Sequence, residues 1–151
     1  MRYIHFLATF LAFLGMQGCG MAPIKREIPL PSQELDAPVA GPGFVRMVVF
    51  NSSGGIMHGI DRTGHINLSL DGKGAGYVPM GSYLILEVPP GAHRMELAHR
   101  DLWLMRSEHE IEVKAPRAFL RIFSTAVSND FEYVKELPPD FGSDYEKAVA
   151  E

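Results

Sequence analysis

Asp61, His65 and Ser69 carry the side chains of a hydrolase triad, and they follow one another at an even spacing of four residues. On a strand this spacing places them on one face, but successive Cα atoms are then about 13 Å apart. A nucleophile and its base must lie within hydrogen-bond reach, about 3 Å. The sequence also has no G-x-S-x-G segment, which would indicate a nucleophile elbow. We therefore do not expect an enzyme.

The six histidines raise the question of a metal site. His93 and His99 are six residues apart, so they face the same way on a continuous strand, with His109 opposite. A zinc site uses three or four ligands that neighbouring groups hold in place. The nearby glutamates are spaced as the charges of a solvated face, and His93 follows a turn whose carbonyls and carboxylates offer it hydrogen bonds. We expect neither a metal nor a noncovalent cofactor.

Cys19 is the only cysteine, and it ends an apolar N-terminal run. Before it come the positive charge of Arg2, the uncharged stretch Phe6–Met16 and the small residue Gly18. This order is typical of a secretory signal peptide. The stretch is shorter than the roughly 20 residues that span a bilayer as a helix. We therefore expect residues 1–18 to direct export and then to be removed.

The residues that lead to Cys19 resemble the lipobox of bacterial lipoproteins, although Met16 and Gln17 depart from its preferred types. The resemblance implies a diacylglycerol and an N-acyl chain on Cys19, and Gly20 after it implies the outer membrane. Because each buried methylene contributes about 0.8 kcal/mol, several chains together give a stable anchor. Two alternatives remain, namely cleavage nearby that leaves a free thiol, or a thiol buried in an uncleaved helix.

The expected organisation is a signal peptide at 1–18, a lipid-anchored flexible linker at 19–43 and one domain at 44–151. The linker assignment depends on five prolines between residues 20 and 43, which disfavour a helix or a central strand. As an alternative, Ile28 and Leu30 alternate and could pack on the domain as an edge strand. Without residues 1–18, whose only charged side chain is Arg2, the chain has 13 basic and 18 acidic residues. This net charge of −5 gives no indication of nucleic-acid binding.

From Phe44 onward, short apolar-alternating runs are separated by turn signals. Residues 65–70 alternate and are followed by Asp71-Gly72, the dipeptide of a tight hairpin. Seven or eight such strands predict an all-β fold, an antiparallel β-sandwich. A capping-box pattern at Ser143 and Glu146 predicts a short C-terminal helix, with Phe141, Tyr145 and Val149 on one face.

The segment around the only tryptophan, Trp103, is apolar from Leu102 through Leu104. In one interpretation it is a strand buried on both faces, with Trp103 in the core. In the other it is a junction between strands, where Trp103 is an exposed anchor for a partner. Leu102, Trp103 and Leu104 are therefore the candidate partner-binding residues.

The stretch from Leu70 to Leu97 resembles a family of bacterial lipoproteins known as domain-of-unknown-function family 2846. The shared segments are Asp71-Gly72-Lys73, Gly81-Ser82-Tyr83, Val88-Pro89-Pro90-Gly91 and His93, in that order. The chain departs from the family at residues 73–76, which include an extra glycine. Similar segments occur in transthyretin-like and carboxypeptidase-regulatory-like sandwiches. The resemblance implies a signal peptide, a lipid anchor and an exported β-sandwich, and it brings no reaction or catalytic residues.

The function that we expect is that of an outer-membrane-anchored periplasmic lipoprotein whose β-sandwich binds an unidentified ligand or partner. The alternative is a structural lipoprotein subunit of an envelope secretion or transport assembly. The expected partners are the membrane, through the lipid, and envelope proteins.

The ring of Tyr83 is expected to be buried against the opposite sheet.

Overall fold

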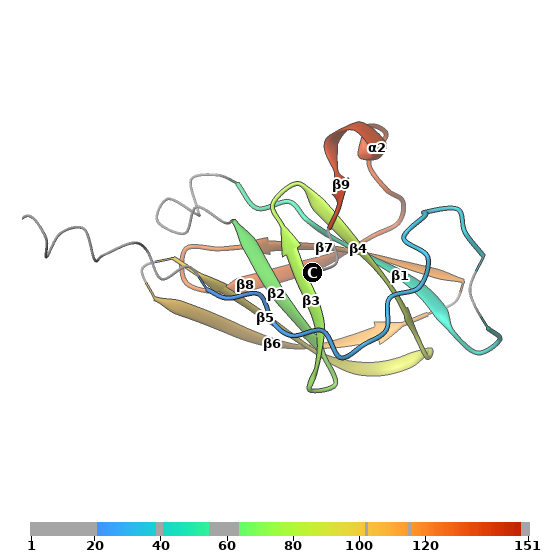
Figure 1. The fold of residues 1–151 in the computed structure, drawn as a ribbon, viewed down its shortest axis with the longest axis horizontal. Helices are drawn as coiled ribbons and strands as arrows, with labels where there is room; N and C mark the ends of the chain where they lie inside the picture. Colours follow the sequence, from blue (N-terminus) through green and yellow to red (C-terminus); the bar gives the residue numbers. More distant parts are fainter. Residues whose placement is uncertain (1–20, 39–40, 55–63, 102, 115, 149–151) are drawn as a thin grey trace, which may run out of the picture.

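The strands form two sheets that pack face to face as a sandwich (Figure 1). The computed structural model describes residues 21–38, 41–54, 64–101, 103–114 and 116–148. One sheet has the strand order β8-β7-β1-β4-β9, and the other has the order β3-β2-β5-β6. The elements are β1 (Val45–Asn51), β2 (His65–Leu70), β3 (Lys73–Pro79), β4 (Ser82–Val88), β5 (Gly91–Arg100), β6 (Leu104–Val113), β7 (Arg117–Ser124), β8 (Asn129–Val134), α2 (Phe141–Asp144) and β9 (Glu146–Lys147). The predicted β-sandwich with a short helix near the C-terminus is confirmed.

Alternate side chains of the two sheets meet in one apolar core. On β2, Ile66, Leu68 and Leu70 are buried in this core, as their spacing predicts. Leu68 pairs with Leu97 of β5, and Leu70 pairs with Met95. A slip of one residue would move this whole set to the opposite face of the sheet, where His65, Asn67 and Ser69 lie, so burial of the core fixes the register of the strands.

The turn between β2 and β3 forms at the predicted Asp71-Gly72 dipeptide. Both residues have positive φ angles, 52° and 77°, which suit the right-handed twist of a two-residue hairpin. The Asp71 N–H also donates to the Arg94 carbonyl at 2.8 Å, and the Arg94 N–H donates to Asp71 Oδ1 at 2.9 Å. The turn is therefore attached to β5 as well as to its own strands.

Two strand pairs are parallel, which differs from the purely antiparallel sandwich that was expected. β1 pairs with β7 in parallel, and β4 pairs with β9 in parallel. The hairpin-connected neighbours, such as β5 and β6, are antiparallel. Turn signals report only on strands that follow one another, so they carry no information about these two long-range pairings.

The outer face of the five-stranded sheet carries a second apolar cluster. Phe50 and Tyr83 meet Phe141 there, with ring centroids 5.3 Å and 5.1 Å apart, and burial raises the pKa of the Tyr83 hydroxyl. The prediction that Tyr83 packs against the opposite sheet is therefore wrong. Its ring is buried on the other side of its own sheet, because α2 and the chain after it cover that face.

The capping box predicted at Ser143 and Glu146 does not form, and the helix is shorter than predicted. The helix has only four residues, and Tyr145 is extended, with φ −126° and ψ 128°. The N–H of Glu146 donates to the Gly81 carbonyl at 2.9 Å, so this segment pairs with β4 rather than completing a second helical turn. Val149 lies outside the described residues. Within the described ranges, the structure contains no helix with the length and hydropathy that a bilayer crossing requires.

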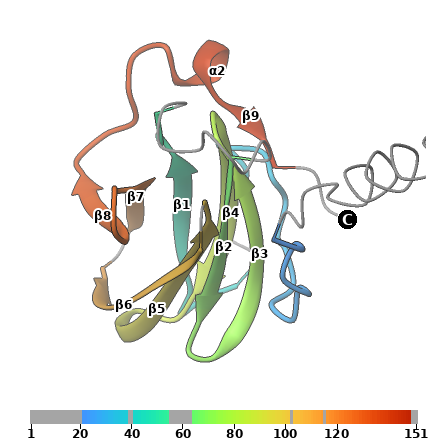
Figure 2. The same ribbon diagram turned by 90° about the vertical axis from the view of Figure 1, so that its left-hand side faces the viewer.

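Residues 21–38, which we call the N-terminal strap, lie along the open side of the sandwich next to β3 (Figure 2). The strap begins over the four-stranded sheet, where the Ile24 N–H donates to Asn67 Oδ1 at 3.2 Å and Asn67 Nδ2 donates to the Ala22 carbonyl at 3.0 Å. It then follows the free edge of β3, where the Glu27 N–H donates to the Gly74 carbonyl at 2.7 Å.

The second half of the strap crosses to the five-stranded sheet. The side-chain amide of Gln33 bonds both backbone groups of Ile85 in β4, accepting from the N–H at 2.9 Å and donating to the carbonyl at 3.0 Å. Buried Arg46 donates to the Glu34 carbonyl at 2.8 Å and pairs with Glu87 at 3.2 Å. The strap thus covers the edges of β3 and β4, the kind of exposed edge at which other chains can pair.

Ile28 and Leu30 of the strap pack against the core between the two sheets. No strand forms there, but the contacts favour the alternative in which these residues pack on the domain. Over residues 21–38, the expected free linker is instead a packed segment.

Candidate functional site

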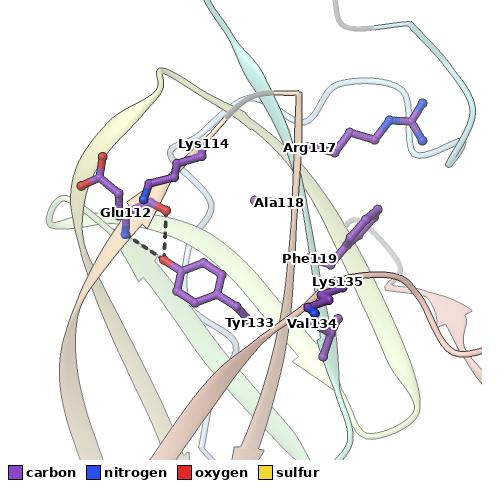
Figure 3. A pocket seen from close by; sticks show the side chains of 8 residues that line it. All are labelled: Glu112, Lys114, Arg117, Ala118, Phe119, Tyr133, Val134 and Lys135. Carbon is purple, nitrogen blue, oxygen red and sulfur yellow. Dashed lines mark hydrogen bonds between the residues drawn. The ribbon is translucent and has the colours of Figure 1, made fainter.

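A cleft of about 340 Å³ opens where β6, the last strand of one sheet, approaches β7 and β8 of the other (Figure 3). Its lining residues are Glu112, Lys114, Arg117, Ala118, Phe119, Tyr133, Val134 and Lys135. The Tyr133 hydroxyl accepts a hydrogen bond from the Glu112 N–H at 2.7 Å and donates to the Glu112 carbonyl at 3.1 Å. These two bonds connect β8 to β6 and fix the position of the aromatic ring in the cleft. The volume lies within the range of small-molecule pockets.

The charge of the cleft is opposite to that of the whole chain. Lys114, Arg117 and Lys135 line it against a single acidic residue, whereas the chain has a net charge of −4. The ion pairs that the described residues form do not include these three cations. Their charges are therefore available to a ligand. Figure 3 shows Phe119, Val134 and Lys135 on one side of β7, and Lys114 with Tyr133 on the other.

The arrangement suits the binding of an anion that also has an apolar part. Cationic side chains attract carboxylate or phosphate groups, and convergent polar groups on an apolar lining are typical of ligand sites. Among the described lining residues none is a histidine, serine or cysteine. The lining therefore lacks the serine or cysteine and the histidine of a hydrolase triad.

Sequence reasoning missed this cleft. Its cations come from the β6–β7 connection, from the first residue of β7 and from the residue that follows β8, and the outermost two, Lys114 and Lys135, are 21 residues apart in the chain. The available signal was the placement of unpaired positive charges at the ends of neighbouring strands. That signal depends on knowing that β6 and β8 lie close together, which comes from the packing of the two sheets.

His93 has the hydrogen-bonded role that was predicted for it. Its Nδ1 lies 2.7 Å from Asp71 Oδ2, and its Nε2 lies 2.8 Å from the Pro89 carbonyl. The hydrogen bond with His93 lowers the pKa of Asp71. Burial of the ring opposes its protonation, but the hydrogen bonds to Asp71 and Pro89 outweigh that effect and raise the pKa of His93. This histidine therefore connects two turns at one end of the sandwich.

The other two histidines of the predicted group, His99 and His109, also contact other residues of the fold. His99 is buried, and its Nδ1 lies 2.5 Å from Asn129 Oδ1. His109 contacts the ring of Phe131 at a centroid distance of 5.0 Å. Its strand position, opposite Met95, puts it on the same face as His93 and His99. Within the described part of the chain, no three His, Cys, Asp or Glu side chains group as metal ligands would.

The triad-like residues are only partly described, because Asp61 lies outside the described residues. His65 and Ser69 both lie on β2, four residues apart on one strand. His65 packs its ring against Tyr77, with centroids 5.5 Å apart. The strand geometry thus keeps these two side chains from forming a nucleophile–base pair.

Trp103 and Leu104 are exposed at the turn between β5 and β6, with 61% and 45% of their surfaces accessible. The interpretation that placed Trp103 in the core is wrong. β5 and β6 form a hairpin, and Trp103 lies in its turn rather than in a buried strand. Leu102 and Cys19, the remaining predicted site residues, lie outside the described residues.

Comparisons with protein-family models, with characterised proteins and with solved structures give no match for this chain. The resemblance of residues 70–97 to family 2846 therefore stays a prediction. Two surfaces of the described residues are the candidate sites, the cationic cleft and the exposed turn.

Proposed function

We propose that this chain is a lipoprotein, anchored through Cys19 to the periplasmic side of the outer membrane, whose β-sandwich binds an anionic ligand in the β6–β8 cleft. The anchor is supported by the signal-peptide pattern and the single cysteine that ends it. The binding role is supported by one observation above all, the three cations that line a cleft with a fixed aromatic ring. In this proposal the protein is a binding module and not an enzyme.

The class of ligand follows from the lining. A compact inorganic anion would use the cations but leave Phe119 and Tyr133 without a contact, whereas an organic acid would use both. Within an envelope, soluble fragments of wall polymers are organic molecules with free carboxylates. We therefore propose a carboxylate-bearing organic ligand, with inorganic phosphate as the weaker comparison.

Titration followed by NMR tests the cleft. The mature chain with Cys19→Ser is titrated with soluble wall fragments and, separately, with inorganic phosphate. We expect shifts at Phe119 and Tyr133 and at least a tenfold weaker affinity in the double variant Lys114→Gln/Lys135→Gln. A matched control, Lys25→Gln/Lys73→Gln, removes two exposed charges elsewhere and should bind as the parent protein does. Equal affinity in both double variants would contradict the proposed site.

Cell fractionation tests the anchor separately. The tagged protein should sediment with outer membranes, and Cys19→Ser should move it to the soluble fraction. In-cell crosslinking addresses the alternative of a structural subunit. An assembly subunit should capture a fixed, stoichiometric set of envelope proteins. If the cleft variant captures the same set as the parent protein, the assembly interpretation is favoured over a ligand-binding module.

A further inference from the structure

One end of the sandwich gathers exposed apolar side chains. Met80 lies at the β3–β4 turn, Trp103 and Leu104 at the β5–β6 turn, and Val127 at the β7–β8 turn, with exposed fractions of 45%, 61%, 45% and 81%. The strand pairings place all three turns at the same end of the molecule, since β2 links β3 to β5 and β1 links β4 to β7. We call it the apolar end. Of the described large hydrophobic residues that are exposed, only Phe44 and Tyr133 lie elsewhere.

The two turns that carry Trp103 and Val127 are held together by a buried amide. Asn129, the first residue of β8, donates from Nδ2 to the Leu97 carbonyl at 3.2 Å and to the Met105 carbonyl at 3.4 Å. The β7–β8 turn is itself closed by the Thr125 N–H, which donates to the Ser128 carbonyl at 2.9 Å. The apolar side chains therefore project from turns with fixed positions.

The strap begins at this same end. Met21 and Ala22 line a groove together with Leu104 and Ala98, and Asn67 holds the backbone of residues 22–24 on the sheet beside it. In Figure 1 the first described residues lie next to the β5–β6 turn. The part of the chain nearest to Cys19 thus lies against one of the exposed apolar residues.

Covalent geometry then limits the position of an anchor. Cys19 precedes Met21 by two residues, and an extended chain advances at most about 3.6 Å per residue. A lipid on Cys19 therefore emerges within about 7 Å of Met21, next to the apolar end. Tryptophan and leucine are the residue types that favour the interface between lipid headgroups and acyl chains.

We propose that the apolar end docks on the lipid surface that holds the anchor, with Trp103 and Leu104 inserted at the headgroup level. This inference depends on the proposed anchoring at Cys19. Because the anchor keeps the domain at the bilayer, even a weak apolar contact is enough to orient it. β6 runs away from this contact for ten residues, so the cationic cleft at its other end points into the periplasm, about 30 Å from the membrane.

The single tryptophan makes the proposal testable. The full lipidated protein is reconstituted into phosphatidylethanolamine–phosphatidylglycerol vesicles, with or without bromine on the acyl chains, and Trp103 emission is recorded. We expect a shift to shorter wavelength and at least twofold quenching by the brominated lipid. Leu104→Ser/Val127→Ser should remove most of that quenching. Phe44→Ser, an equally exposed residue at the other end, should not.

The outcomes separate the two proposals. If the protein floats with the vesicles but Trp103 stays unquenched and open to iodide, the docking inference is wrong and the anchor stands. If the protein does not float, the anchor fails and the docking inference fails with it. If Trp103 is shielded without vesicles and the molecular mass doubles with concentration, the apolar end binds a second copy of the chain, and membrane docking is overturned.

Discussion

Replacing Gly74 with alanine should detach the strap from the sandwich. A Cβ at this position would lie 2.2 Å from the Lys25 carbonyl oxygen, a backbone atom of the strap. A Cβ atom does not approach a non-bonded heavy atom this closely, and a backbone atom cannot avoid the clash by a change of rotamer. The strap must therefore move away from β3 over the residues that bond to it.

The size of the effect follows from the contacts that are lost. Four hydrogen bonds join the strap to β3 here: Glu27 N–H to the Gly74 carbonyl, Ile28 N–H to the same carbonyl, Gly74 N–H to Glu27 Oε2, and Arg26 Nε to the Ala75 carbonyl. At about 0.5 kcal/mol each near the surface they contribute about 2 kcal/mol. Partial exposure of Ile28 and Leu30 adds about 1 kcal/mol. The lower entropy of the unfolded alanine variant offsets about 0.5 kcal/mol of this loss. The free energy of unfolding should therefore fall by roughly 2 to 3 kcal/mol.

Urea unfolding followed by circular dichroism measures this change on the mature chain with Cys19→Ser. With a slope of about 2 kcal/mol per molar urea, the midpoint should fall by about 1 M. Gly54→Ala is the matched control, since a Cβ there meets no atom within 4 Å. Hydrogen exchange should show lost protection at Glu27 and Ile28 in the Gly74→Ala variant. An unchanged midpoint together with protected amides would refute the reasoning.

Three further predictions concern stability. The pKa of His93 is raised by folding, so its contribution to stability is complete below pH 6.5 and is lost as the pH rises further. The pKa of Asp71 is lowered, so its contribution is complete above pH 3.8 and is lost as the pH falls further. Urea midpoints should therefore be highest between these values, and His93→Gln should flatten the decline above pH 6.5. Asn129→Ala removes a buried donor to two carbonyls and should lower the free energy of unfolding by about 2 kcal/mol in urea titrations, and a loss below 0.5 kcal/mol would contradict its bridging role. Arg46→Met breaks a buried ion pair with Glu87 and should cost about 3 kcal/mol in the same assay, with a neutral result showing that the strap does not depend on it.

Local patterns predicted the parts of the structure that depend on neighbouring residues. The alternation of Ile66, Leu68 and Leu70 reports burial on one face, and Asp71-Gly72 reports a turn geometry that few other dipeptides tolerate. The turn before His93 likewise placed its hydrogen-bond acceptors within reach. Each of these features is encoded within a few residues, so the sequence carries them without knowledge of the fold.

The features that sequence reasoning missed are set by contacts between distant segments. Nothing near the prolines of the strap indicates that Gln33 and Arg46 will hold it, because their partners come from the sheet edges. Gly74, one of the two glycines within residues 73–76, matches the close approach of the strap to β3. The sequence left Trp103 between a buried strand and an exposed junction, because apolarity indicates burial on average. Its position in a hairpin turn follows only from the topology.

The separation of the strap from its partners in the chain also sets an order of events in time. Ile24 bonds to a residue 43 positions later, and Gln33 to one 52 positions later. Contacts this distant close only after the local hairpins have formed. Until the sheets exist, the strap therefore has no partner on which to close. When the strap finally closes, a tether of 25 residues that could extend about 80 Å shortens to the few residues beside Cys19. Under the proposed anchoring at Cys19, completion of folding would thus itself draw the domain toward the membrane.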